Sequence, residues 1–126
     1  MQIEVASELV ELGRDDDGEI IIGERFAVRV TAASGRRWEH ERSWTAGAFA
    51  AGYDSEGWPI YRRVEREISE GAAQRLADAV RSAIGAGRKL DAARWTEIQP
   101  AYGSSAYEAA EAEIVAAERR RDQERV

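Results

Sequence analysis

Three consecutive aspartates followed by a glycine, at positions 15–18, form the densest group of metal-ligating side chains in the sequence. If Gly18 occupies the sixth position of a calcium-binding loop of the EF-hand type, then Asp15, Asp17 and Glu24 take the third, fifth and twelfth positions, which supply oxygen ligands. The first ligand position is then a glycine without a side-chain oxygen, and the flanking sequence indicates strands rather than helices. An Asp-Gly pair between two strands is also typical of a tight hairpin turn. We therefore expect a turn here, with no bound metal.

His40 is the only histidine, so any imidazole chemistry depends on it. Ser34 or Ser43, together with Asp54, has the residue types of a Ser-His-Asp triad, but neither serine lies in a nucleophile-elbow motif. The glutamates on either side of His40 fall on the opposite face of a strand, which separates them from the imidazole as metal ligands. We expect no catalytic residue, no metal and no cofactor, and therefore a binding protein rather than an enzyme.

Aromatic side chains are interspersed with arginines between positions 38 and 63. This mixture is compatible with three roles: the core of a small sheet, the hot spot of a protein interface, and a stacking surface for single-stranded nucleic acid. We favour the core for most of them, because a small sheet covered by helices needs large residues. Trp58 precedes Pro59 in a predicted turn, so we expect this indole to be exposed, and we assign it with Tyr61 to a partner-binding surface. The aromatic residues are Trp38, Trp44, Tyr53, Trp58 and Tyr61, and the arginines are Arg42, Arg62 and Arg63.

The net charge of −6 is distributed unevenly over the 126 residues. Residues 1–24 carry −7, residues 25–63 carry +3, and the remainder carries −2. This distribution does not produce the basic face that general nucleic-acid binding needs. It suits docking on a basic surface of another protein, and we assign the acidic residues of the predicted turn to that contact. They are Asp15, Asp16, Asp17 and Glu19. The simpler alternative is an acidic surface that serves solubility alone.

The chain has no cysteine, which excludes disulfides, thiol nucleophiles and cysteine-based metal sites. Its first residues lack the basic and then apolar pattern of a signal peptide, and no segment approaches the roughly 20 apolar residues of a membrane span. We therefore expect a cytoplasmic protein.

The hydrophobic pattern predicts a single α+β domain, with the strands in its N-terminal half. Alternating apolar residues in 1–64 indicate an antiparallel meander of about four or five strands, the first interrupted by a bulge near residues 9–12. Phe26, Val28 and Val30 mark the clearest half-buried strand. Two C-terminal helices are expected to pack on this sheet.

The C-terminal half is predicted to contain a helix, an elbow and a second helix. Apolar residues at spacings of three and four indicate a helix over 69–86, with Ser69 as its N-cap. Residues 95–107 combine Trp95 and two tyrosines with a proline and a glycine, which predicts a fixed, aromatic-packed elbow over 95–105.

The second helix is expected over 106–124, with a capping box at Ser105 and Glu108. Its apolar stripe is narrow, so we expect its first half to pack on the body and the remainder to project and fray. A homodimer through this helix is possible on that pattern.

The run Pro-Ala-Tyr-Gly-Ser-Ser-Ala-Tyr at positions 100–107 resembles the C-terminal ends of short proteins from proteobacteria and their phages. The small size, the acidity and the absence of cysteine are also similar to phage accessory proteins, which include inhibitors of host defence. This resemblance implies an interaction role and supplies no site residues.

We therefore expect a non-enzymatic module that docks an acidic surface on a basic, nucleic-acid-handling protein, without binding nucleic acid or membrane itself. The alternative is a small-ligand-binding domain or an enzyme, with its site between the sheet and the helices.

Overall fold

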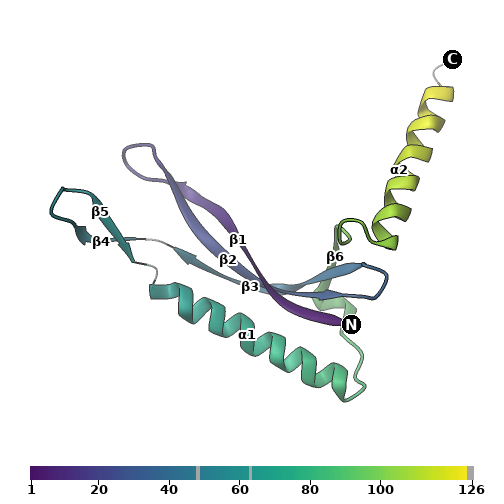
Figure 1. Ribbon diagram of the computed structural model, residues 1–126, viewed down its shortest axis with the longest axis horizontal. Coiled ribbons are helices and arrows are strands. Elements are labelled where there is room, and N and C mark those ends of the chain that lie inside the picture. The colour runs from purple at the N-terminus through teal and green to yellow at the C-terminus, as the bar shows by residue number, and fades with distance from the viewer. Residues whose placement is uncertain (48, 63, 125–126) are drawn as a thin grey trace.

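The computed structural model describes residues 1–47, 49–62 and 64–124, with residues 49–52, 59–62 and 64 described by their backbone. This part of the chain forms six strands and two α-helices, with a short 3-10 turn, η1, before the last strand (Figure 1). In order, they are β1 (Gln2–Arg14), β2 (Ile20–Thr31), β3 (Arg37–Gly47), β4 (Phe49–Tyr53), β5 (Pro59–Arg62), α1 (Val64–Gly85), η1 (Ala92–Arg94), β6 (Trp95–Ile98) and α2 (Ser105–Glu124).

Four of these strands form one antiparallel sheet in the order β1-β2-β3-β6. The predicted α+β class, an antiparallel sheet with helices after it, is confirmed. The predicted continuous meander is wrong in one respect, because β4 and β5 form a separate two-stranded hairpin and the fourth strand of the sheet is β6. This strand lies within the predicted elbow and pairs with β3, placing Trp95 opposite His40.

The predicted bulge in the first strand is confirmed, since the β1–β2 register shifts between Glu11 and Gly13. Leu12 is the extra residue, and its side chain lies over Gly23 of β2. A Cβ on Gly23 would come within 2.8 Å of Leu12 Cδ1. Glycine at position 23 therefore leaves the space that Leu12 occupies.

The core lies between α1 and one face of the sheet, and α1 contacts β1, β2 and β3 (Figure 1). Phe26, Val28 and Val30 alternate along β2 on this face and are at most 2% exposed, as the strand period predicts. Ala73 and Ala77 are the fully buried helix residues, and their small size lets the helix backbone approach the sheet. Each large apolar side chain buried here contributes about 1.5–3 kcal/mol.

Helix α1 begins at Val64, so the assignment of Ser69 as its N-cap is wrong. Ser69 lies inside the helix and is buried. Glu65 and Glu67 occupy the first turn, where carboxylates interact favourably with the helix dipole. The helix therefore extends about one turn further toward the N-terminus than the apolar period indicates.

The elbow is fixed by backbone hydrogen bonds to the turn between β2 and β3. The Ala101 N–H donates to the Gly35 carbonyl over 2.9 Å, and the Ala106 N–H donates to the Ser34 carbonyl over 2.9 Å. The rings of Tyr102 and Tyr107 are in contact, with centroids 5.1 Å apart. Trp95 is not part of this aromatic contact.

Helix α2 starts at the predicted place but has a different cap. The Ser104 hydroxyl oxygen accepts the N–H of Tyr107, whereas the predicted cap, Ser105, donates its hydroxyl to the Ser34 carbonyl. Figure 1 shows α2 projecting from the sheet, and none of its described residues is buried. The structure therefore packs α1, and not α2, across the sheet.

Candidate functional site

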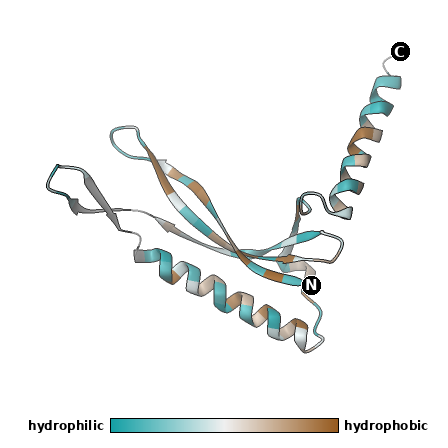
Figure 2. Ribbon diagram, in the orientation of Figure 1, coloured by the Kyte–Doolittle hydropathy of each residue, from teal (hydrophilic) through white to brown (hydrophobic). Residues whose placement is uncertain are grey.

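The end of the β1–β2 hairpin extends beyond the part of the sheet that α1 covers (Figure 1). We define the hairpin arm as residues 9–24. Figure 2 shows hydrophobic segments in both of its strands beside a hydrophilic turn. The arm therefore combines the predicted acidic site with apolar flanks that the sequence analysis did not assign to a site.

Backbone contacts hold the turn of the arm closed. Asp15 Oδ1 accepts the N–H groups of Asp17 and Glu19, at 3.0 and 2.9 Å, and Gly18 has a φ of +81°. The Arg14 guanidinium donates to the Gly18 carbonyl over 2.7 Å. Asp15 thus serves the turn, and the described residues contain no group of three or more His, Cys, Asp or Glu side chains placed to hold a metal.

The other acids of the turn point their charge at solvent. Asp16, Asp17 and Glu19 are exposed, and none forms an ion pair with another residue that the structure describes. The turn therefore presents three carboxylates that no described residue neutralises, at the end of a hairpin closed by hydrogen bonds.

Apolar side chains flank these carboxylates on the face of the arm that continues the core. Ile20 and Ile22 alternate with Glu24, which forms an ion pair with Arg66 of α1 at 3.0 Å, so all three β2 residues share that face. Leu9 pairs with Glu24 in the register and is 66% exposed. Ile20 and Ile22 are each almost half exposed.

The β4–β5 hairpin repeats the turn geometry of the arm. Asp54 Oδ1 accepts the N–H groups of Glu56 and Trp58, both at 2.9 Å, and Gly57 has a φ of +86°. Trp58 is 67% exposed at the end of this turn, as expected, and Tyr53 is also exposed. The side chain of Tyr61 lies outside the described residues, so its assigned role stays a prediction.

His40 is buried in the sheet and has a structural contact. Three β3 residues, 40–42, lie opposite the single residue Val28 of β2, so the pairing of the two strands is irregular at this point. His40 Nδ1 accepts this N–H at 3.0 Å, and its ring lies edge-on to Trp95 at 4.9 Å between centroids. Burial lowers the pKa of His40, and Arg94 and Arg42 lower it further against the opposing charge of Glu41.

The residues considered for a triad do not assemble around His40. The Asp54 carboxylate accepts hydrogen bonds within its own turn, and Ser34 lies in the β2–β3 turn beneath α2. Ser43 of β3 lies opposite Ala27 of β2 in the strand register. The histidine therefore stabilises the irregular part of β3.

The arginines of β2 are neutralised on the face of the sheet opposite α1. Arg25 forms ion pairs with Glu8 and Glu39, and Arg29 Nε lies 3.0 Å from Glu39. Glu39 thus pairs with both arginines, whereas Glu41 pairs with Arg94. These contacts leave no basic stripe on β2 to attract phosphates.

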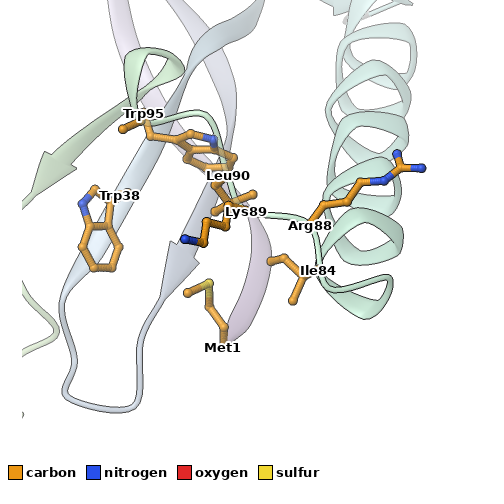
Figure 3. Close-up of a pocket in the computed structure, with 8 residues that line it drawn as sticks. Met1, Trp38, Ile84, Arg88, Lys89, Leu90 and Trp95 are labelled. Atoms are coloured by element: carbon orange, nitrogen blue, oxygen red, sulfur yellow. The ribbon is translucent and has the colours of Figure 1, made fainter.

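Trp44 and Trp38, both on β3, have different surroundings: one packs against the core and the other lines a cavity. Trp44 packs against the core cluster around Phe26, as favoured from the sequence. The Arg36 guanidinium carbon lies 4.9 Å from the centroid of the Trp38 ring, and Trp38 lines a cavity of about 410 Å³. Figure 3 shows this cavity between the end of α1, β3 and the segment leading into β6. Its lining residues are Met1, Trp38, Ile84, Arg88, Lys89, Leu90, Ala92 and Trp95.

No family model matches the chain, and searches among curated proteins and among solved structures each returned no match. Among the described residues, neither helix has the length and the apolar character needed to cross a lipid bilayer.

Proposed function

We propose that this protein is an interaction module that docks its hairpin arm on a basic surface of another protein. The observation that carries this proposal is the pairing of exposed apolar side chains with uncompensated carboxylates on one hairpin. Leu9, Ile20 and Ile22 flank the turn that presents Asp16 and Asp17.

Each part of the arm supports a different aspect of binding. Large exposed apolar patches on soluble proteins mark interaction sites, and their burial supplies affinity. Carboxylates around the patch accelerate association with a cationic surface and select against acidic partners. A partner groove that normally holds nucleic acid has the matching charge, with the carboxylates in the positions of phosphates.

The fold supports an accessory role because the arm extends beyond the core that α1 covers. A partner can therefore bind the arm while that core stays intact. Glycine and aspartate fix the geometry of its turn, so binding requires little ordering of the backbone. This arrangement agrees with the resemblance to phage accessory proteins, and inhibition of a nucleic-acid-handling host protein is the specific role we propose.

A photo-crosslinking experiment in a lysate of the organism that encodes the protein tests this proposal. A benzophenone amino acid replaces Ile20, and crosslinked partners are identified by mass spectrometry. We expect capture of a basic protein, with at least tenfold less capture when Asp16, Asp17 and Glu19 are replaced by their amides. The matched control replaces three exposed acids of α2, Glu118, Asp122 and Glu124, by their amides. Equal loss in the control, or capture that salt does not weaken, contradicts docking by the arm.

We propose a second copy of the chain as the partner of α2. Ile114 and Val115 lie at the centre of the helix and are 60% and 41% exposed. The first half carries Glu108, Glu111 and Glu113 and no base, whereas all three arginines of the helix, at positions 119–121, lie in the second half among three further acids. An antiparallel pair places the acidic first half of each helix beside the arginine cluster of the other and the two central residues beside their copies, whereas a parallel pair places the two acidic first halves together.

A further inference from the structure

The cavity at the end of α1 has the size and lining of a small-molecule site. Its volume of about 410 Å³ lies within the range of about 300–1,000 Å³ that is usual for ligand pockets. Trp38 and Trp95 supply aromatic walls, and Ile84 and Leu90 supply aliphatic ones. Such a lining selects a flat, apolar ligand body.

The aromatic walls are held by contacts outside the cavity. Trp38 is covered by the Arg36 guanidinium, which is fixed in turn by a 2.8 Å ion pair with Glu97. Trp95 packs its ring against His40. Both indoles are therefore positioned without a ligand.

The cavity contains a cation that the rest of the described structure does not neutralise. Lys89 forms no ion pair or side-chain hydrogen bond with any described residue, and no carboxylate is among the residues that line the cavity. The neighbouring Asp91 caps η1, accepting the Ala93 N–H at 3.1 Å, and lies 3.6 Å from Arg94. Figure 3 shows the Lys89 amine directed toward Trp38, whereas the Arg88 guanidinium points away from the other labelled side chains.

The end of α1 fixes the backbone beside this lysine. Gly87 adopts a φ of +75° and donates its N–H to the Ile84 carbonyl, and the Arg88 N–H donates to the Ala83 carbonyl over 2.9 Å. This glycine-based C-cap directs the chain from the helix into the segment whose residues Arg88, Lys89 and Leu90 line the cavity.

We propose that this cavity binds a small aromatic carboxylate, with the ring between Trp38 and Trp95 and the carboxylate on Lys89. A lone ammonium on an exposed side chain is a point charge, which suits a single carboxylate, while the apolar walls contact the ring. This inference is independent of the role proposed for the hairpin arm.

A matched pair of probes tests the charge and the ring separately. The probes are 2-naphthoate and 2-naphthamide, which share one ring system and differ in charge. Calorimetry gives their affinities, and we expect the carboxylate to bind about tenfold more tightly. Lys89→Gln removes this preference, whereas Lys89→Arg keeps it. Arg75→Gln, which removes a charge from an exposed position of α1, is the control that leaves the preference unchanged.

The single lysine also provides a direct structural readout. Reductive ¹³C-methylation keeps the charge of Lys89, the only side-chain amine in the chain, and the signal missing from Lys89→Gln distinguishes it from that of the terminal α-amine. We expect 2-naphthoate to shift this methyl signal and the indole signals of Trp38 and Trp95, and to leave that of Trp58 unchanged. Equal affinities of the two probes, absence of binding, or shifts confined to Trp58 overturns the proposal. The methyl spectrum and circular dichroism of each variant establish that it is folded.

Discussion

A Cβ atom built on Gly35 would lie 2.1 Å from both Cβ and Oγ of Ser104. Gly35 is at the turn between β2 and β3, and Ser104 caps α2. The close approach lets the Gly35 carbonyl accept the Ala101 N–H and thereby joins the C-terminal segment to the sheet. A residue without a side chain at position 35 is therefore what allows the elbow to dock.

We expect Gly35→Ala to destabilise the protein more than Gly57→Ala. Both glycines have a positive φ, +94° and +86°, so both substitutions carry the cost of about 1–2 kcal/mol for the left-handed region. A Cβ on Gly57 meets no atom within 4 Å, whereas one on Gly35 overlaps Ser104, which adds about 1–3 kcal/mol. Urea unfolding measures both free energies, and equal losses would show that the contact with Ser104 is absent.

The ion-pair network of Glu39 predicts a loss of stability in acid. Burial raises the pKa of Glu39, but hydrogen bonds from Arg25 and Arg29 outweigh it, so the pKa lies below its usual value. Stability from this carboxylate is therefore present above its unfolded-state pKa, about 4.3, and is lost as the pH falls through the lower folded-state pKa.

Glu39→Gln tests this network. We expect it to lower the free energy of unfolding at pH 7 by about 1–3 kcal/mol and to flatten its decline in acid. Glu113→Gln, at an exposed position of α2, is the control with the same chemical change. If both variants keep the acid dependence of the parent protein, Glu39 does not contribute it.

His40 predicts a second pH dependence, at higher pH. Because burial holds the pKa of His40 below its ordinary value of about 6.5, the unfolded chain takes up a proton in this range before the folded chain does. The free energy of unfolding therefore falls as the pH decreases from about 6.5 toward the folded-state pKa.

Two substitutions separate the titration of His40 from its hydrogen bond. Asn places its oxygen near the position of Nδ1, so His40→Asn keeps an acceptor for the Arg42 N–H but removes the titration. We expect His40→Leu to lose about 1–3 kcal/mol more than His40→Asn, because it leaves that N–H unpaired. Both variants should lack the decline just below pH 6.5, and a variant that retains it would assign the titration to another group.

Local sequence signals were sufficient where neighbouring residues decide the structure. The alternation of Phe26, Val28 and Val30 predicted β2, and the Asp-Gly pair predicted the turn that Asp15 closes. The short Trp95–Ile98 segment was not identified as a strand, because its partner β3 lies far earlier in the chain and four residues show almost no period. Ser69 was assigned as a cap from its position before an apolar period, although the helix begins at Val64 and Ser69 lies buried inside it.

The candidate sites also divide into those that neighbouring residues predict and those that depend on contacts between distant segments. The carboxylates and Trp58 were predicted from composition and turn type, which are local properties. The cavity was not located, because Trp38, Lys89 and Trp95 meet only when α1 ends beside β3 and β6. The available signal was the single lysine of the chain two residues after Gly87, the glycine that ends the helix.

Antiparallel pairing of α2 with a second copy predicts a dimer that charge reversal can break and restore. We expect sedimentation equilibrium to give a dimer for the parent protein and a monomer for Ile114→Asp, which places two carboxylates together at the centre of the pair. Replacing Arg119, Arg120 and Arg121 by glutamate should also give a monomer, because acidic halves then face acidic halves.

A chain with Glu108, Glu111 and Glu113 replaced by arginine supplies the complementary partner. Mixing the two reversed chains should restore a dimer at low salt, because each α2 then finds the opposite charge on the other chain. Pairing should weaken at about 0.5 M salt, where surface charges are screened within a few ångströms. A monomeric parent protein at high concentration would exclude α2 as a self-association surface, and dimers of each reversed chain alone would exclude the antiparallel arrangement.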